Sequence, residues 1–113
     1  MHEMSIAESI VKIALDCAAK ENAVRISKLD LSIGTLAGIE FEALEFALEV
    51  VKKGSILERA EIVIDKVQAK AKCLECGTGY EAPQVFSKCP ECGGYSTQLI
   101  SGKELQVRSL VID

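Results

Sequence analysis

Aromatic side chains are scarce in this chain of 113 residues, which has three Phe, two Tyr and no Trp. Proteins that stack bases on their surface rely on such rings, so the sequence offers no platform for ligands of this kind. Hydrophobic residues make up 49% of the chain, and most of them must therefore be aliphatic. At this length they can form the core of one compact domain, with at most one small appended module.

Basic residues are outnumbered as well, since 13 Lys and Arg stand against 17 Asp and Glu and give a net charge of −4. This sign is wrong for a protein that wraps a phosphate backbone, so we expect no nucleic-acid partner. The sequence also lacks an apolar run of the roughly 20 residues that a membrane span needs. It lacks the basic and hydrophobic segments of a signal peptide too. These absences predict a cytoplasmic protein with no membrane partner.

Histidine occurs only once, as His2. No second imidazole is present to serve a catalytic triad. The glycine pair in residues 34–38 lacks the Lys-Ser/Thr ending of a phosphate-binding loop, and we interpret this segment as a turn between a strand and a helix. We therefore expect a binding protein and not an enzyme.

Apolar residues recur every three or four positions from Ser5 to about Asn22, which predicts a helix that packs on the core. Ser5 and Glu8 have the spacing of a capping box at its first turn, so residues 1–4 are expected to project beyond the helix. Cys17 lies on the apolar stripe, and we expect it to be a small buried side chain.

The remaining pattern predicts an α+β fold, with a small mixed β-sheet covered by two helices. The second helix is expected from about Glu40 to Lys53. Strands are expected at residues 24–33, with a break near Lys28, at 61–72, and at 105–112, with a register slip near Ser109. We expect residues 1–72 to form an α+β domain, completed by a C-terminal strand in 103–113, and residues 73–102 to form an inserted module; the features described next assign nickel to the first of these and zinc to the second.

The case for zinc rests on one turn that occurs twice, as Cys73-Leu-Glu-Cys76-Gly77 and Cys89-Pro-Glu-Cys92-Gly93. Two C-x-x-C turns supply four thiolates that can close a tetrahedron around Zn(II), and a glycine after each turn tolerates the tight backbone. No ligand position is left open for a substrate. The pattern therefore predicts a zinc-ribbon-like module whose metal has a structural role.

Two other functions fit the same cysteines. A rubredoxin-like electron carrier holds one iron in four thiolates, but about ninety residues of this chain would then have no role. A zinc-ribbon adaptor would bind another protein and no second metal. Metal analysis and an absorption spectrum distinguish these alternatives.

The amino terminus, Met1-His2-Glu3, contains a second possible ligand set. The α-amino group of Met1, a backbone amide nitrogen and the His2 imidazole can converge on one metal through fused chelate rings. Planar, nitrogen-rich donors of this kind suit Ni(II) or Cu(II). The fourth donor could be the backbone amide or the carboxylate of Glu3, and the sequence does not decide between them.

Taken together, these features resemble a known family. The sequence MHEMSI opens an amphipathic helix, a strand ends in Leu31-Ser32-Ile33-Gly34, and CLECG and CPECG follow. This combination resembles the HypA family (also called HybF) of hydrogenase maturation factors over essentially the whole chain.

The resemblance implies a nickel metallochaperone with a separate structural zinc site. Nickel would be bound by Met1, His2 and Glu3, and zinc by four cysteines, which are Cys73, Cys76, Cys89 and Cys92. Glu40 occupies a place where some members have an acidic residue associated with nickel. The implied partners are the GTPase HypB, the hydrogenase large subunit and, in some organisms, urease maturation proteins. Some members have histidines beside the zinc cysteines, where this chain has Gly77 and Gly93.

Overall fold

The computed structural model of the chain describes residues 2–84 and 87–113. It contains two compact units. The first unit comprises Met1–Ser32, Ile39–Asp65 and Gln106–Asp113, and the second comprises Ile33–Gly38 and Lys66–Leu105. The nickel-binding and zinc-binding domains predicted from the sequence are defined by the metal that each would bind and not by compactness, so they stay predictions.

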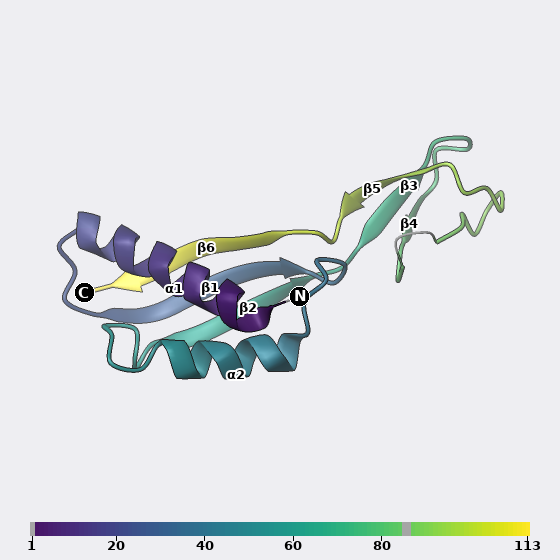
Figure 1. Cartoon of the computed structure of the whole chain (residues 1–113). Coiled ribbons are helices and arrows are strands. Elements are labelled where there is room, and N and C mark those ends of the chain that lie inside the picture. Colours follow the sequence, from purple (N-terminus) through teal and green to yellow (C-terminus); the bar gives the residue numbers. More distant parts are fainter. Residues whose placement is uncertain (1, 85–86) are drawn as a thin grey trace. The chain divides into compact units, whose positions relative to one another are not determined.

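The first unit consists of two helices and a three-stranded sheet (Figure 1). The elements are α1 (Glu3–Lys20), β1 (Ile26–Gly34), α2 (Phe41–Val51), β2 (Glu61–Val67) and β6 (Leu105–Ile112). The strand order is β2-β1-β6. The arrows in Figure 1 show that β2 runs parallel to β1 and that β6 runs antiparallel to it, so α2 forms the crossover that two parallel strands require. The predicted α+β fold with a small mixed sheet and two helices is confirmed.

The core of this unit is aliphatic, as the shortage of aromatic residues predicts. α1 buries a stripe of five residues, Ala7, Ile10, Val11, Ala14 and Ala18, and α2 buries Leu44, Ala47 and Leu48. These residues recur at helical spacing, and the small alanines let the helices approach the sheet closely. The buried thiol predicted at position 17 is wrong, because Cys17 is exposed. It lies on the flank of the stripe, beside Ala18 and away from the core.

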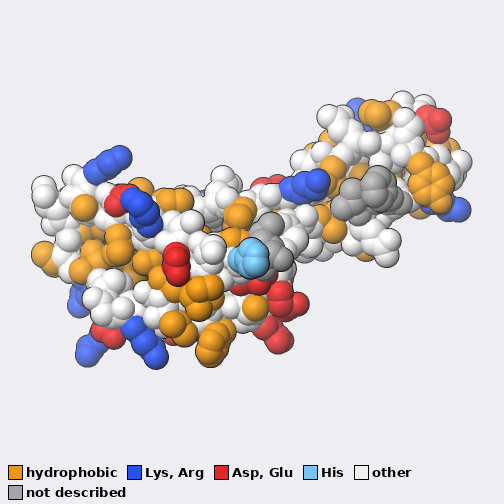
Figure 2. Space-filling model, in the orientation of Figure 1, with side chains coloured by type: hydrophobic (Ala, Val, Ile, Leu, Met, Phe, Trp, Pro, Cys, Tyr) orange, Lys and Arg blue, Asp and Glu red, His pale blue; other side chains and the backbone are white. Residues whose placement is uncertain are grey.

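α1 begins earlier than the sequence predicts. Its first helical residue is Glu3 and its N-cap is His2, whose carbonyl oxygen accepts a hydrogen bond from the backbone N–H of Ile6 (3.2 Å). Ser5 is therefore inside the helix, and the predicted capping box between Ser5 and Glu8 is wrong. The His2 imidazole is exposed at the surface (pale blue in Figure 2) and makes no capping hydrogen bond.

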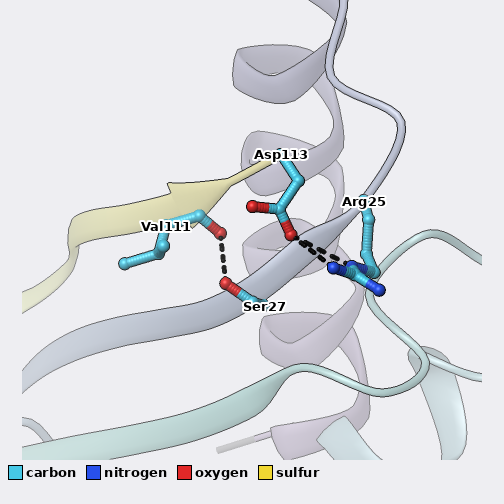
Figure 3. Close-up of polar contacts among 4 residues, drawn as sticks. All are labelled: Arg25, Ser27, Val111 and Asp113. Atoms are coloured by element: carbon cyan, nitrogen blue, oxygen red, sulfur yellow. Dashed lines mark hydrogen bonds and ion pairs between the residues drawn. The ribbon is translucent and has the colours of Figure 1, made fainter.

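The start of β1 and the end of β6 are tied together by backbone and side-chain contacts (Figure 3). The Arg25 guanidinium lies 2.8 Å from the Asp113 carboxylate, and the backbone N–H of Asp113 donates to the carbonyl oxygen of Arg25 at 2.9 Å. Along β1, Ile26 and Leu29 are both buried although they are three residues apart. This shift of phase agrees with the predicted break in alternation near Lys28.

The second unit contains an antiparallel sheet of three short strands, β3 (Lys70–Cys73), β4 (Gly79–Glu81) and β5 (Thr97–Ser101), in the order β4-β3-β5. Its small core consists of Ala69, Ala71 and Ala82, with Leu36, Tyr80 and Leu99 packed against them. The single strand predicted over residues 61–72 is in fact two strands, β2 and β3. Residues 68 and 69 interrupt it.

One close approach in this unit requires a glycine. A Cβ atom on Gly34 would lie 2.0 Å from the backbone carbonyl carbon and oxygen of Gly102. We expect Gly34→Ala to lower the free energy of unfolding by about 1–3 kcal/mol, because two backbone segments must separate to admit the methyl group. Urea unfolding followed by circular dichroism measures this change. Gly79→Ala is the matched control, since nothing lies within 4 Å of a Cβ there. Equal stability of the two variants would contradict the prediction.

Candidate metal centres

The two C-x-x-C segments fold into the same turn twice. The backbone N–H of Gly77 donates to the carbonyl oxygen of Cys73 at 2.9 Å, and the N–H of Gly93 donates to the carbonyl oxygen of Cys89 at 2.9 Å. Both glycines have positive φ angles, 79° and 73°, a conformation that side chains other than glycine rarely adopt. The repeated sequence therefore produces two equivalent turns that face each other.

The four cysteine sulfurs gather within 4.8 Å of one another. Sγ of Cys73 lies 3.5 Å from Sγ of Cys92, and Sγ of Cys76 lies 3.6 Å from Sγ of Cys89. A tetrahedral zinc ion with bonds of about 2.3 Å places its sulfurs about 3.8 Å apart. The cluster thus has the donor atoms, the number of donors and the spacing that a tetrahedral metal ion needs.

The first cysteine of each turn is buried and the second is exposed. Cys73 and Cys89 are completely buried, whereas Cys76 and Cys92 are exposed. An ion held by these four sulfurs would be covered from one side by the protein and would face solvent on the other.

Without a cation, the pKa values of the two exposed thiols, Cys76 and Cys92, shift in opposite directions. Hydrogen bonds from the hydroxyl and backbone N–H of Thr78 lower the pKa of Cys76 to about 6. The backbone N–H of Gly94 lowers the pKa of Cys92, but the hydrogen bond with the Cys73 thiol, desolvation and the other two thiols together outweigh it and raise that pKa to about 12. A bound dication would remove this conflict, because it favours the thiolate form of all its ligands.

The predicted nickel ligands lie at the start of α1. His2 is exposed, and Glu3 is half-buried. Met1, the third residue of the predicted set, lies outside the described residues. The backbone N–H of Glu40 donates to Oε2 of Glu3 at 3.2 Å. The structure therefore brings the beginning of the chain to the beginning of α2.

This contact compensates for a missing cap. Glu40 is the N-cap residue of α2, and its side chain makes no capping hydrogen bond. The first N–H groups of a helix have no partner inside the helix, and a carboxylate is stabilised by the partial positive charge at that end. Glu3 supplies this carboxylate from a distant part of the sequence. The absence of Ser, Thr, Asp or Asn before α2 is the one sequence signal that could have indicated such a contact.

The same hydrogen bond affects the ionisation of Glu3. The backbone N–H of Glu40, followed by the N–H of Glu3 itself, lowers the pKa of the Glu3 carboxyl. A carboxyl group whose pKa is lower in the folded state stabilises that state above its unfolded pKa. This contribution is lost as the pH falls through the lowered value, so the link between Glu3 and α2 is intact at neutral pH.

The described part of the chain contains no helix that is both long enough and apolar enough to span a bilayer.

Comparison with known proteins identifies relatives from one family, which match almost the whole chain. The family model described as "HypA: Hydrogenase/urease nickel incorporation, metallochaperone, hypA" matches residues 1–112. The chain is 43% identical to the hydrogenase maturation factor HypA of Parabacteroides distasonis over 112 residues, which covers 99% of this chain and 97% of that protein. It is 44% identical to the factor of the same name from Chlorobium luteolum over 114 residues, with coverage of 100% and 97%.

Solved structures agree on the fold. The solution structure of the Ni metallochaperone HypA from Helicobacter pylori matches with a TM-score of 0.68 at 21% identity, and the match covers 99% of this chain and 97% of that one. A second solution structure of a HypA protein matches with a TM-score of 0.71 at 21% identity, covering 99% and 96%. The arrangement of helices and strands is therefore shared with these proteins.

Proposed function

Because this chain belongs to the HypA family of hydrogenase and urease nickel-incorporation metallochaperones, we propose that it binds Ni(II) at its amino terminus and delivers it to the [NiFe] hydrogenase large subunit. The observation that carries the proposal is the position of His2. Its imidazole is exposed and makes no capping hydrogen bond at the first turn of α1, next to a Glu3 side chain that accepts a hydrogen bond from the start of α2.

The first turn of α1 also contains backbone nitrogens that no carbonyl oxygen holds, although the N–H of Glu3 contacts the carboxylate of its own side chain. The amides of His2 and Glu3 precede the first intrahelical hydrogen bond, which Ile6 donates, so they have no carbonyl partner one turn earlier. Loss of their protons would not break the helix, and the partial positive charge at this end favours that loss. Together with the Met1 amine and the His2 imidazole, they form a planar nitrogen donor set suited to Ni(II).

In this proposal the four cysteines hold Zn(II) and the zinc has a structural role. When bound, the ion supplies four bonds that join the turn at Cys73–Cys76 to the turn at Cys89–Cys92. No position remains open for a substrate. Metal transfer therefore does not involve this cluster, and the protein is not an enzyme.

The free energy that makes nickel transfer directional must then come from a partner protein. We propose that this partner is the GTPase HypB and that the transfer takes place in the cytoplasm. In organisms that use urease, the same nickel site would serve urease maturation. The family match over residues 1–112 supports a chaperone over the rubredoxin-like carrier or the zinc-ribbon adaptor, because those two functions need only the cysteine segment. A red, iron-containing protein would contradict the proposal.

Adding two residues, Gly-Ser, before Met1 tests the role of the terminal amine. An acylated nitrogen is a poor donor, so we expect nickel affinity to fall at least about tenfold, or about 1.4 kcal/mol. Calorimetric titration of zinc-loaded protein measures the change. The matched control carries Gly-Ser after Asp113 and should bind nickel as the parent does. Unchanged affinity in the N-terminally extended protein would exclude the Met1 amine as a ligand.

A further inference from the structure

The outer side of α2 exposes a large aromatic side chain. Phe46 is 70% exposed and Val50, one helical turn later, is 43% exposed, although the opposite side of the helix is buried in the core. The chain has only three phenylalanines, and an exposed one removes a large apolar group from the core. Exposed apolar side chains that cluster on one face commonly mark an interaction surface.

Phe46 borders a groove between α2 and the neighbouring strand β2. The groove has a volume of about 390 Å³ and is lined by Glu42, Glu45, Phe46, Leu48, Glu49, Ile62 and Ile64. Leu48 is buried, and Ile62 and Ile64 are half-buried. The groove is therefore apolar along its floor and acidic along its rim.

The acidic rim is largely uncompensated. Within the described residues, Glu49 lies 3.1 Å from the Lys52 ammonium, and neither Glu42 nor Glu45 forms an ion pair. Figure 2 shows acidic side chains at the end of α2 that lies nearest the N-terminus. Carboxylates at the edge of an apolar surface attract partners of opposite charge and repel those of the same charge.

We propose that this groove binds an amphipathic helix of a partner protein whose Lys or Arg residues flank its apolar side. A basic helix would place its apolar side chains against Phe46, Ile62 and Ile64 and its cations against the glutamates, which is the helix-in-groove mode of recognition. β2 is an edge strand of its sheet, so a strand added to that edge is the competing mode, and amide NMR shifts confined to β2 would indicate it. Two copies meeting groove to groove would bring their acidic rims together, and phosphate-rich ligands would be repelled.

A synthetic peptide provides a direct test. The probe is a fluorescein-labelled helix of about 18 residues, or five turns, with leucines on one side and lysines on the other. A second peptide of the same composition distributes the leucines around the helix. Titration of zinc-loaded, full-length protein at about 150 mM salt, where long-range attraction is screened, should give at least about tenfold tighter binding of the amphipathic peptide.

Matched variants locate the binding surface. Phe46→Ser and Glu45→Lys should each weaken peptide binding at least about tenfold. Val24→Ser and Glu8→Lys change an exposed apolar residue and an exposed acidic residue elsewhere on the same unit. The peptide affinity of these two control variants should stay within about twofold of the parent value. Amide NMR shifts on peptide addition should concentrate in α2 and β2. Circular dichroism verifies that each variant is folded.

Three outcomes would overturn this proposal. They are no binding of the amphipathic peptide, equal binding of the two peptides, and equal loss in the groove and control variants. Concentration-dependent dimers that Phe46→Ser abolishes would assign the groove to a second copy of the chain instead. Nickel titration of the same variants keeps this test separate from the proposed function, because the groove residues are not among the proposed metal donors.

Discussion

Replacing His2 with Ala is expected to reduce nickel affinity at least about 100-fold, or about 2.7 kcal/mol, and to leave the fold intact. The imidazole is the only side-chain nitrogen in the proposed donor set, and its loss opens one of the chelate rings. The fold should not change, because the side chain is exposed and makes no capping hydrogen bond. Only its backbone carbonyl takes part in the first helical turn.

Calorimetry on zinc-loaded protein, with zinc content measured in parallel, checks this result. Glu8→Ala is the matched control, because Glu8 is an exposed residue of the same helix that could bind a metal nonspecifically. It should bind nickel as the parent does. If His2→Ala and the parent bound nickel equally, the amino terminus could not be the nickel site.

The second large effect concerns the cysteine cluster. Cys89→Ala should abolish stoichiometric zinc binding and unfold residues 66–105. The core of the second unit consists of three alanines and a few half-buried side chains, which is too little to offset the entropy of ordering the chain. Four-ligand zinc sites in small peptides contribute an apparent 10–16 kcal/mol or so at neutral pH, so the metal should decide whether this unit folds.

Metal analysis and amide NMR distinguish the expected result from a general loss of structure. Signals from α1 and α2 should persist, because the first unit has its own aliphatic core, while signals from β3, β4 and β5 should collapse. Cys17→Ala removes a thiol that is exposed and outside the cluster, so it should retain full zinc content. Retention of one zinc per chain by Cys89→Ala would show that the cluster is not the zinc site.

Patterns local in sequence predicted the elements of this fold well. The 3.6-residue period located both helices, and alternation located the closing strand. Their ends were less predictable, because they depend on contacts between distant residues. α2 starts where it does with a cap supplied by Glu3, a residue that no local pattern connects with Glu40. The break between β2 and β3 was not predicted either, because apolar and polar residues continue to alternate through Ala69. The place of Ala69 in the core of the second unit results only from packing between distant residues.

The burial of side chains on the flank of a helix was similarly hard to predict from the sequence. Cys17 follows Ala14 at helical spacing, yet it is exposed, because the width of the buried stripe is set by what packs against it. Phe46 is a second case of the same kind, because its residue type favours the interior and yet its side chain is exposed. The cysteine site was readable from spacing because each turn is encoded within five residues. The proposed amino-terminal site rests chiefly on the family resemblance, because a single histidine near a chain end carries little information.

The unequal exposure of the four cysteines has a kinetic consequence. A chelator arriving from solvent meets Cys76 and Cys92 first, since Cys73 and Cys89 are shielded. Bound metal would therefore leave by stepwise ligand exchange, in which the two outer sulfurs are displaced while the inner pair keeps its hold. The lifetime of the ion in the protein would then depend on two accessible bonds, and an otherwise firmly bound ion could be extracted quickly by a reagent that reaches that edge.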